Sequence, residues 1–334
     1  MGNWRMIGHT EIITLLKEQI RRGTAPQAYL ITGVEGVGRH TLALRLSQAL
    51  NCPQPIAPAE PCSVCQTCMQ IEHMQHPDLY VVRAEQGSRQ ILVDQVRALQ
   101  HWLSLTPYVG PMRIALLLCF EDANPSAANA LLKTLEEPPP RAILILTAES
   151  EELLLPTIVS RCEVMRLQPQ PIATVSLGLQ QLYGIPAEEA ELLAHLSGGR
   201  PGYALWLHQH PEQQEQRQTR LEEFMRLLYS NRFERFVFAA QISSNKEDLT
   251  NVLKLWISFW RDVLLSIAKT PSEPINIDFR EQIEQLVAQL DLHTAQSFLN
   301  ALGRTLNNLM TSNINPRLAC EVMFLDMPYL PLRP

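Results

Sequence analysis

The sequence predicts an α/β domain with a parallel β-sheet in its first half and all-α domains in its second half. As far as residue 167, short apolar runs alternate with stretches in which apolar residues recur at helical spacing. Strands that alternate with helices pair in parallel and are covered by helices on both faces. After residues 168–171, where proline stands at alternate positions, every segment has helical periodicity.

Five apolar runs are predicted as strands, and the stretches between and after them as helices. The strands are Ala28–Thr32, Leu79–Val82, Ile114–Phe120, Ile143–Thr147 and Val164–Leu167. The helices among them are Thr41–Leu50, Val93–Leu103 and Ser126–Leu135. Beyond the linker, short helices precede longer ones: Ile172–Leu182, Ala187–Leu196, Pro201–His208, Leu221–Leu228, Leu253–Ile267, Ile283–Leu290 and Ala295–Leu309.

These patterns divide the chain into three predicted domains. Residues 1–168 form the sheet domain, with a cysteine-rich module at about residues 52–68 inserted at the edge of the sheet. Residues 169–209 form a small helical lid domain, and residues 210–334 form a helical bundle. Trp256 and Trp260 lie four residues apart and share a helix face, which we expect to pack in the bundle core.

Composition restricts the function classes. Apolar residues make up 46% of the 334 residues, which is ordinary for globular domains. The net charge of −6 argues against a strongly basic, autonomous nucleic-acid binder, so any DNA contact is expected to be local or shared with partners. The longest apolar run, Ile114–Phe120, is too short to span a bilayer, and no secretory segment opens the chain. We therefore expect a cytoplasmic protein.

Residues 33–41 (GVEGVGRHT) match the phosphate-loop template G-x-x-x-x-G-K-[ST] only in part. The residues of this degenerate loop are Gly33, Gly36, Gly38, Arg39, His40 and Thr41. Arg39 replaces the lysine that reaches the terminal phosphates, and its guanidinium is bulkier and forked. His40 replaces the hydroxyl that binds Mg²⁺, an ion that prefers oxygen ligands. We predict that ATP is not hydrolysed at this loop, although its glycine backbone leaves weak nucleotide binding open.

Two acids follow the predicted strand Ile114–Phe120, as in a Walker B strand. In an active site one carboxylate holds the Mg²⁺ shell and the next polarises the attacking water. Here the order is Glu121-Asp122, the reverse of the usual pair. Without a hydroxyl ligand at position 40, these acids have little metal to organise.

Four of the seven cysteines lie in one segment: Cys52, Cys62, Cys65 and Cys68. Four thiolates without an open position describe a structural zinc site. Free thiols or two disulfides are the alternatives, but disulfides are rare in the cytosol, so zinc is favoured. With four thiolates present, His73 and His76 are expected to be surface or capping residues. The other three cysteines are predicted to be buried thiols: Cys119, Cys162 and Cys320.

Two further motifs identify a family. Residues 126–140 are SAANALLKTLEEPPP, and residues 157–162 are TIVSRC. The chain resembles the clamp-loader branch of the AAA+ ATPases, in which a four-cysteine module is inserted at the same position. The resemblance covers about the first 205 residues by motif, and the rest only by length and helical pattern.

Within that family, two features favour the non-hydrolysing delta prime branch over the ATP-hydrolysing gamma/tau branch. The first is the degenerate loop, which the delta prime branch tolerates. The second is QHPDLY at residues 75–80 followed by ILVDQVR at residues 91–97, which resembles the HPD…VDxVR pattern of that branch.

The resemblance also implies roles for single residues. Arg161 of TIVSRC matches an arginine finger, which points at the ATP of a neighbouring motor subunit. The alternative is a surface arginine paired with an acid such as Glu163. Thr147 matches the polar sensor position, where a strand cap is the alternative. Arg200 of SGGRP matches the sensor arginine of the lid domain.

The expected function is therefore that of a clamp-loader subunit that completes a ring of ATPases through its helical C-terminal collar. Its expected partners are the gamma/tau motor subunits, the delta subunit and the sliding clamp, with primed DNA reached through the assembled complex. One alternative is an active gamma/tau-like ATPase with an unusual loop. Another is a zinc-bearing interaction protein outside replication that kept the AAA+ frame.

Overall fold

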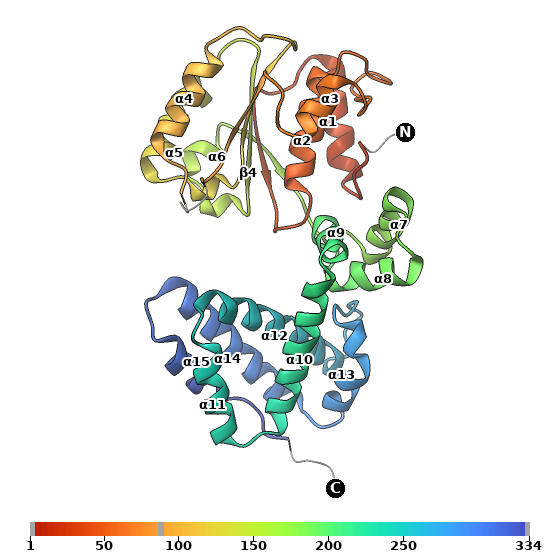
Figure 1. The fold of residues 1–334 in the computed structure, drawn as a ribbon, viewed down its shortest axis with the longest axis vertical. Coiled ribbons are helices and arrows are strands. Elements are labelled where there is room, and N and C mark those ends of the chain that lie inside the picture. The colour runs from red at the N-terminus through yellow and green to blue at the C-terminus, as the bar shows by residue number, and fades with distance from the viewer. Residues whose placement is uncertain (1–3, 86–89, 331–334) are drawn as a thin grey trace. The chain divides into compact units, whose positions relative to one another are not determined.

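The computed structural model describes residues 4–85 and 90–330 (Figure 1). The chain folds into two compact units. Unit 1 comprises residues 1–190 and 199–204, and unit 2 comprises residues 191–198 and 205–334, each as far as it is described. The finer division into three domains at residues 168 and 209 stays a prediction. Among the described residues, no helix is both long and apolar enough to cross a membrane.

Unit 1 is built on a five-stranded sheet in which all neighbouring strands are parallel, as predicted. The strands are β1 (Ala28–Thr32), β2 (Leu79–Val82), β3 (Arg113–Leu117), β4 (Ala142–Ala148) and β5 (Glu163–Arg166). Their order in the sheet is β2-β3-β4-β1-β5. The carboxyl ends of β3, β4 and β1 are therefore neighbours, and ligands bind at such edges in parallel sheets.

Helices cover both faces of this sheet, as Figure 1 shows. One face carries α1 (Thr10–Arg22), α2 (Arg39–Asn51) and α3 (Gln66–Glu72). The opposite face carries α4 (Val93–Leu103), α5 (Pro125–Glu136) and the short α6 (Pro156–Val159). Because the sheet is covered on both sides, every residue of β1, β3 and β4 is buried, which explains their continuous apolar runs.

Alternate residues of each central strand pack into opposite cores. Leu30 and Leu144 pack with α4, α5 and α6, whereas Tyr29 and Ile145 pack with α1, α2 and α3. The side chains follow the two-residue period of a strand, so both cores are filled from the same short runs.

The prediction for β3 was wrong at its carboxyl end. The strand ends at Leu117, and not at Phe120. Cys119 has a left-handed backbone with φ of 50°, and a 3₁₀ turn follows at Phe120–Asp122 (η1). A residue with positive φ cannot continue a pleated strand. The two acids therefore lie on a turn that bends away from the sheet.

Three helices follow the sheet: α7 (Ile172–Tyr183), α8 (Ala187–Leu196) and α9 (Pro201–Gln209). α7 belongs to unit 1, and α8 and α9 each contribute residues to both units. Their bounds agree with the predicted short helices to within one residue.

Unit 2 is otherwise all helical. Its helices are α10 (Pro211–Tyr229), α11 (Arg232–Ile242), α12 (Lys246–Ile267), α13 (Arg280–Val287), α14 (Leu292–Thr311) and α15 (Pro316–Leu325). A short 3₁₀ turn at Ile277–Phe279 (η3) precedes α13, and another at Glu151–Leu153 (η2) belongs to unit 1. Trp256 and Trp260 are 1% and 0% exposed, and both pack against Phe224. The prediction that these tryptophans form a core face is confirmed.

Candidate functional site

The degenerate phosphate loop connects β1 to α2. Its three glycines, Gly33, Gly36 and Gly38, have φ angles of 146°, 78° and 113°, which residues with a side chain rarely adopt. A Cβ at Gly36 would lie 2.6 Å from the Cβ of Tyr203. The backbone of a phosphate loop is thus retained, and a segment from the start of α9 packs directly on it.

This contact involves the first N–H groups of α9. The Gly36 carbonyl accepts hydrogen bonds from the N–H of Gly202 at 2.7 Å and of Tyr203 at 3.3 Å. The Arg200 guanidinium lies 4.3 Å from the Tyr203 ring centre. Burial lowers the pKa of Arg200, and the nearby Tyr203 and Glu35 act in the opposite direction. The N–H groups of Gly202 and Tyr203, which could otherwise face an anion at the start of α9, thus donate to the loop itself.

Arg39 and Glu121 form an ion pair at the centre of the site. Arg39 opens α2 and Glu121 follows β3, and Arg39 Nη1 lies 3.8 Å from Glu121 Oε1. The two side chains are only 11% and 16% exposed. Glu121 Oε1 also accepts the Glu149 N–H at 3.0 Å. The carboxylate that would hold a Mg²⁺ shell in an active ATPase therefore faces a guanidinium of the same chain.

The other predicted site residues take no part in the ion pair between Arg39 and Glu121. His40, Thr41 and Asp122 are exposed. Thr147, at the end of β4, is buried, and its hydroxyl accepts the Cys119 N–H at 3.0 Å. The structure thus gives Thr147 a capping contact to the end of β3. The sensor role of Thr147 stays a prediction.

The thiol prediction was wrong for Cys119, which is exposed. Because β3 ends early and Cys119 takes a left-handed backbone that Thr147 holds, its side chain leaves the apolar core. Cys162 is half-buried and Cys320 is buried. Burial raises the pKa of both of these thiols to about 12.

His9 is a site neighbour that sequence reasoning missed. It is 7% exposed, and its Nε2 lies 3.0 Å from the Val37 carbonyl, to which it donates. Its Nδ1 lies 3.3 Å from Gln170 Nε2, so the neutral tautomer satisfies both contacts. Burial lowers the pKa of His9, although the bond to Val37 acts against this. Its partners are 28 and 161 residues away, and no local pattern reveals them.

Arg161 lies just after α6, and its side chain is 34% exposed. Nη2 donates to Glu136 Oε1 at 2.7 Å, and Nη1 donates to the Thr157 carbonyl at 3.0 Å. The acid that we considered as its partner, Glu163, instead accepts a bond from Gln19 at 2.7 Å. Arg161 is therefore partly exposed, and its guanidinium is held by Glu136, the last residue of helix α5.

The four predicted ligand cysteines form a cluster. Their sulfur atoms all lie within 4.8 Å of one another. The distances from Cys52 to Cys62, from Cys52 to Cys65 and from Cys62 to Cys68 are 3.7, 4.0 and 3.9 Å. Four thiolates at about 2.3 Å from a tetrahedral zinc ion are about 3.8 Å apart, so the cluster fits such an ion. These separations are far longer than a disulfide bond of about 2.05 Å.

Backbone N–H groups also stabilise the thiolate form of one cysteine in the cluster. The N–H groups of Val64 and Cys65 lower the pKa of Cys62 to about 6. Burial raises the pKa of Cys65 and Cys68. His73 is exposed and His76 is buried outside the cluster, and neither belongs to it.

Polar contacts fix the cysteine module to the helices beside it. Lys17 of α1 pairs with Glu60 at 2.5 Å, and Trp4 Nε1 donates to the Ala59 carbonyl at 2.9 Å. Gln48 of α2 donates to the Cys68 carbonyl at 2.9 Å. Within unit 1, the module is therefore held by contacts to α1, to the residues before α1 and to α2.

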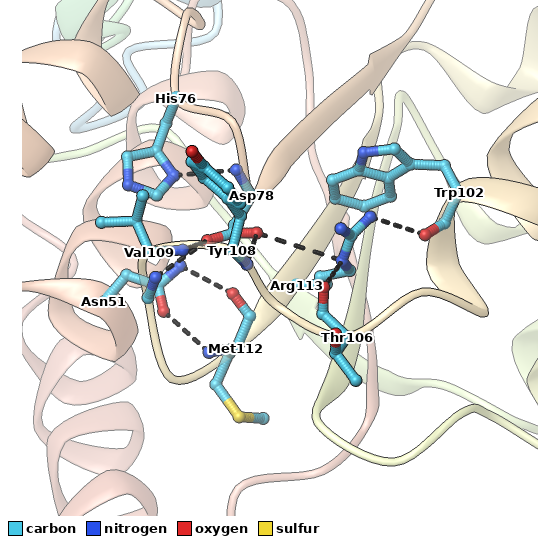
Figure 2. Close-up of polar contacts among 10 residues, drawn as sticks. Asn51, His76, Asp78, Trp102, Thr106, Tyr108, Val109, Met112 and Arg113 are labelled. Carbon is cyan, nitrogen blue, oxygen red and sulfur yellow. Dashed lines mark hydrogen bonds and ion pairs between the residues drawn. The ribbon is translucent and has the colours of Figure 1, made fainter.

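Asp78 of the HPD motif has a structural role (Figure 2). It is fully buried, and its carboxylate accepts the N–H groups of Tyr108, Val109 and Gly110 at 2.6 to 2.8 Å. Burial alone would raise the pKa of Asp78, but these donors more than offset it, and its pKa is lowered. The motif thus pins the loop between α4 and β3, on which Tyr108 is 82% exposed.

Asn51 fixes the same loop from α2. Its side-chain amide donates to the Met112 carbonyl at 3.0 Å and accepts the Met112 N–H at 3.1 Å (Figure 2). Because Asn51 directly precedes Cys52, the loop and the cysteine module share one anchor.

Comparisons with known proteins agree with these features. Residues 8–171 match the family described as "DNA polymerase III, delta subunit". The DNA polymerase III subunit delta' of Pseudomonas aeruginosa is 40% identical over 189 residues, which cover 56% of this chain and 57% of that subunit. The delta' subunit of Bacillus subtilis is 28% identical over 322 residues, 94% of each chain. Subunit tau of Escherichia coli is 30% identical over 177 residues, 53% of this chain and 27% of tau.

The Pseudomonas alignment thus spans little more than half of its subunit, whereas the Bacillus alignment extends over nearly all of both chains. The similarity to tau covers a much smaller share of that protein. The family match, the delta' relatives and the loop that lacks its catalytic residues agree with one another: the chain is similar to DNA polymerase III delta prime subunits.

Proposed function

We propose that this chain is the delta prime subunit of a bacterial clamp loader. It completes a ring with ATPase subunits and helps to load the sliding clamp onto primed DNA, and it does not hydrolyse ATP itself. The names of its relatives support this function.

The ion pair between Arg39 and Glu121 is the observation that carries the proposal. In an active loop the lysine and the hydroxyl bind phosphate and Mg²⁺. Here a buried guanidinium faces the carboxylate that would organise the metal. A loop with this internal pair has lost both catalytic contacts but keeps the frame of the fold, which suits a subunit whose task is assembly.

Arg161 is proposed to take part in ATP hydrolysis at the active site of a neighbouring subunit. In ATP hydrolysis a water oxygen bonds to the γ-phosphorus while the bond to the β-phosphate oxygen breaks, and negative charge develops on the oxygens around them. A guanidinium from a neighbouring subunit stabilises this charge, which is worth roughly 10³- to 10⁵-fold in other phosphoryl-transfer systems. The partial exposure of Arg161, just after the short helix α6, supports this role in trans.

The cysteine cluster is proposed to hold structural zinc. Cys52, Cys62, Cys65 and Cys68 supply four thiolates, and their sulfur separations suit a tetrahedral site without an open position. The ion would stabilise the module and take no part in hydrolysis.

The proposed partners are the gamma/tau motor subunits, the delta subunit and the sliding clamp, and primed DNA is met through the assembled complex. Residues 210–334 are proposed as the collar that joins the ring, and residues 169–209 as the lid. An all-helical unit 2 with a large apolar core supports a collar role.

The test combines assembly with ATP turnover. The purified chain alone should not hydrolyse ATP, and it should form a stable complex when mixed with its motor and delta subunits. Turnover by the isolated chain at rates typical of a motor subunit would instead favour the gamma/tau-like alternative. Failure to assemble would favour an interaction protein outside replication.

A further inference from the structure

The partner of Arg161 is Glu136, the last residue of α5. The hydrogen bond from Arg161 Nη2 to Glu136 Oε1 measures 2.7 Å, and the two side chains are 34% and 51% exposed. The other end nitrogen, Nη1, donates to the Thr157 carbonyl at 3.0 Å and lies 3.4 Å from the Ser160 hydroxyl. Two acceptors from different helices therefore fix the plane of the guanidinium.

Both anchors stand on elements that are packed into the core. Leu131 and Leu135 of α5 are buried in the core cluster that also contains Ile158 of α6. Glu136 follows these leucines directly, and Arg161 follows Ile158 by three positions. The two charged groups are 25 residues apart in sequence, yet each is only a few bonds from a buried neighbour. Sites supported in this way hold their geometry better than sites on free loops.

The pair leaves part of the guanidinium available. Among the described residues, Nε of Arg161 has no hydrogen-bond partner, and the bonds that are present all end on Nη1 and Nη2. Arginine has five N–H donors in one plane, so a guanidinium held by Glu136 and Thr157 can still donate to two phosphate oxygens. Holding a long side chain in place beforehand reduces the entropy lost when it binds.

We propose that Glu136 is a positioning residue, which holds Arg161 in the orientation that reaches the neighbour's ATP. This inference rests on the proposed in-trans role of Arg161. The ion pair is about half exposed, and exposed pairs are weak. It is therefore strong enough to bias the rotamers of Arg161 but too weak to withhold the guanidinium from a triphosphate.

The test isolates the interface that Arg161 serves. The complex is assembled with motor subunits whose own finger arginine is replaced by alanine, so that Arg161 is the only finger in the ring. ATP hydrolysis is then measured with the wild-type chain, E136Q, R161A and the double variant E136Q/R161A. E137Q is the matched control, because Glu137 is the next residue and is exposed, and its side chain makes no hydrogen bond or ion pair with a described residue.

We expect E136Q to lower kcat by about two- to fivefold, with an unchanged KM for ATP and unchanged assembly. E137Q should leave kcat unchanged, and E136D should restore part of the loss because it keeps the carboxylate. In the R161A background, E136Q should have no further effect, because the two residues act through one contact.

Three results would overturn this role of Glu136. One is a kcat of E136Q that equals or exceeds that of the wild type. A kcat above the wild-type value would mean that Glu136 holds Arg161 away from the neighbour's ATP. Another is an equal loss in the R161A background, which would mean that Glu136 only stabilises α5. The third is an R161A ring as active as the wild type, and this result alone would also remove the finger from the proposed function.

Discussion

At the scale of single residues, backbone groups solvate three buried charges. Asp78 accepts three backbone N–H groups, and Asp262 accepts those of Ile275 and Asn276 at 2.9 and 2.7 Å. Arg235, 3% exposed, donates to main-chain carbonyls, including Met327 and Pro328, each at 2.8 Å. A buried charge is costly unless hydrogen bonds replace its water. Each of these residues therefore fixes a loop or chain segment that lacks secondary structure of its own.

Replacing Asp78 should be costly. We expect Asp78→Ala to lower the free energy of unfolding of unit 1 by about 2–4 kcal/mol, because three N–H groups lose their acceptor inside the protein. Urea unfolding measures the change. Asp94→Ala is the control, since the Asp94 side chain is 86% exposed. Equal stabilities of the two variants would mean that the loop before β3 satisfies its N–H groups in another way.

Acid should weaken unit 1 through His9. Its pKa in the folded chain lies below the ordinary value of 6.5, because burial disfavours the charged ring. The unfolded chain therefore binds the proton more readily, so the stabilising contribution is present above about pH 6.5 and is lost as the pH falls through the folded pKa. Urea midpoints should decline from about pH 7.5 to about pH 5.5, and less so in His9→Asn.

Asparagine suits this position because it tolerates the left-handed backbone of residue 9, where φ is 57°. The decline should not vanish in the variant, since burial also lowers the pKa of His76. A wild-type chain and a His9→Asn chain with parallel pH profiles would assign the acid sensitivity to other groups.

Residues that carry local patterns were predictable, and residues whose partners are distant in sequence were not. The cysteine cluster follows from spacing alone, because one short segment, from Cys52 to the start of α3, brings the four thiols together. The pairing of Arg161 with Glu136, and of His9 with Val37 and Gln170, depends on the packing of separate elements. Cys119 was predicted wrongly because the apolar run through Phe120 hides the point at which β3 ends.

At the scale of elements, the cysteine module links α1 to α2. Glu60 and Ala59 contact α1 and the residues before it, and Cys68 contacts α2. On the other side, Asn51 links the end of α2 to the loop before β3. The cysteine module therefore contributes to the order of neighbouring helices, although the sheet has its own core.

One zinc ion per chain should accompany this module. Metal analysis of protein purified without chelator should give about one equivalent, and Cys65→Ser should lower it strongly. Hydrogen exchange should show that residues 52–72 lose protection in this variant, together with part of α1, whereas the strands keep theirs. Full metal content in Cys65→Ser, or loss of protection throughout the sheet, would contradict this description of the module.

At the scale of the whole molecule, the fold class and the sheet could be predicted with few errors. Strands buried on both faces produce continuous apolar runs, and helices between them keep their periodicity. The helices α1, α3 and α6 were not predicted, and α11 and α15 were covered only by the general expectation of helices after the linker. α3 and α6 have only 7 and 4 residues, too few to show a helical period, and the 13-residue α1 was overlooked. The strand and the helix on either side of the glycine loop could thus be predicted from the sequence. The contacts that other segments make with this loop could not be predicted.

The central claim is that a chain without ATPase activity of its own contributes Arg161 to a neighbour's active site. Clamp loading onto primed DNA by the reconstituted complex tests it most directly, with wild-type, Arg161→Ala and Arg161→Lys chains. We expect Arg161→Ala to assemble normally and to slow loading by about tenfold or more, and lysine to restore little, because an ammonium lacks the planar fork. An Arg161→Ala complex that loads clamps at the wild-type rate would contradict the claim.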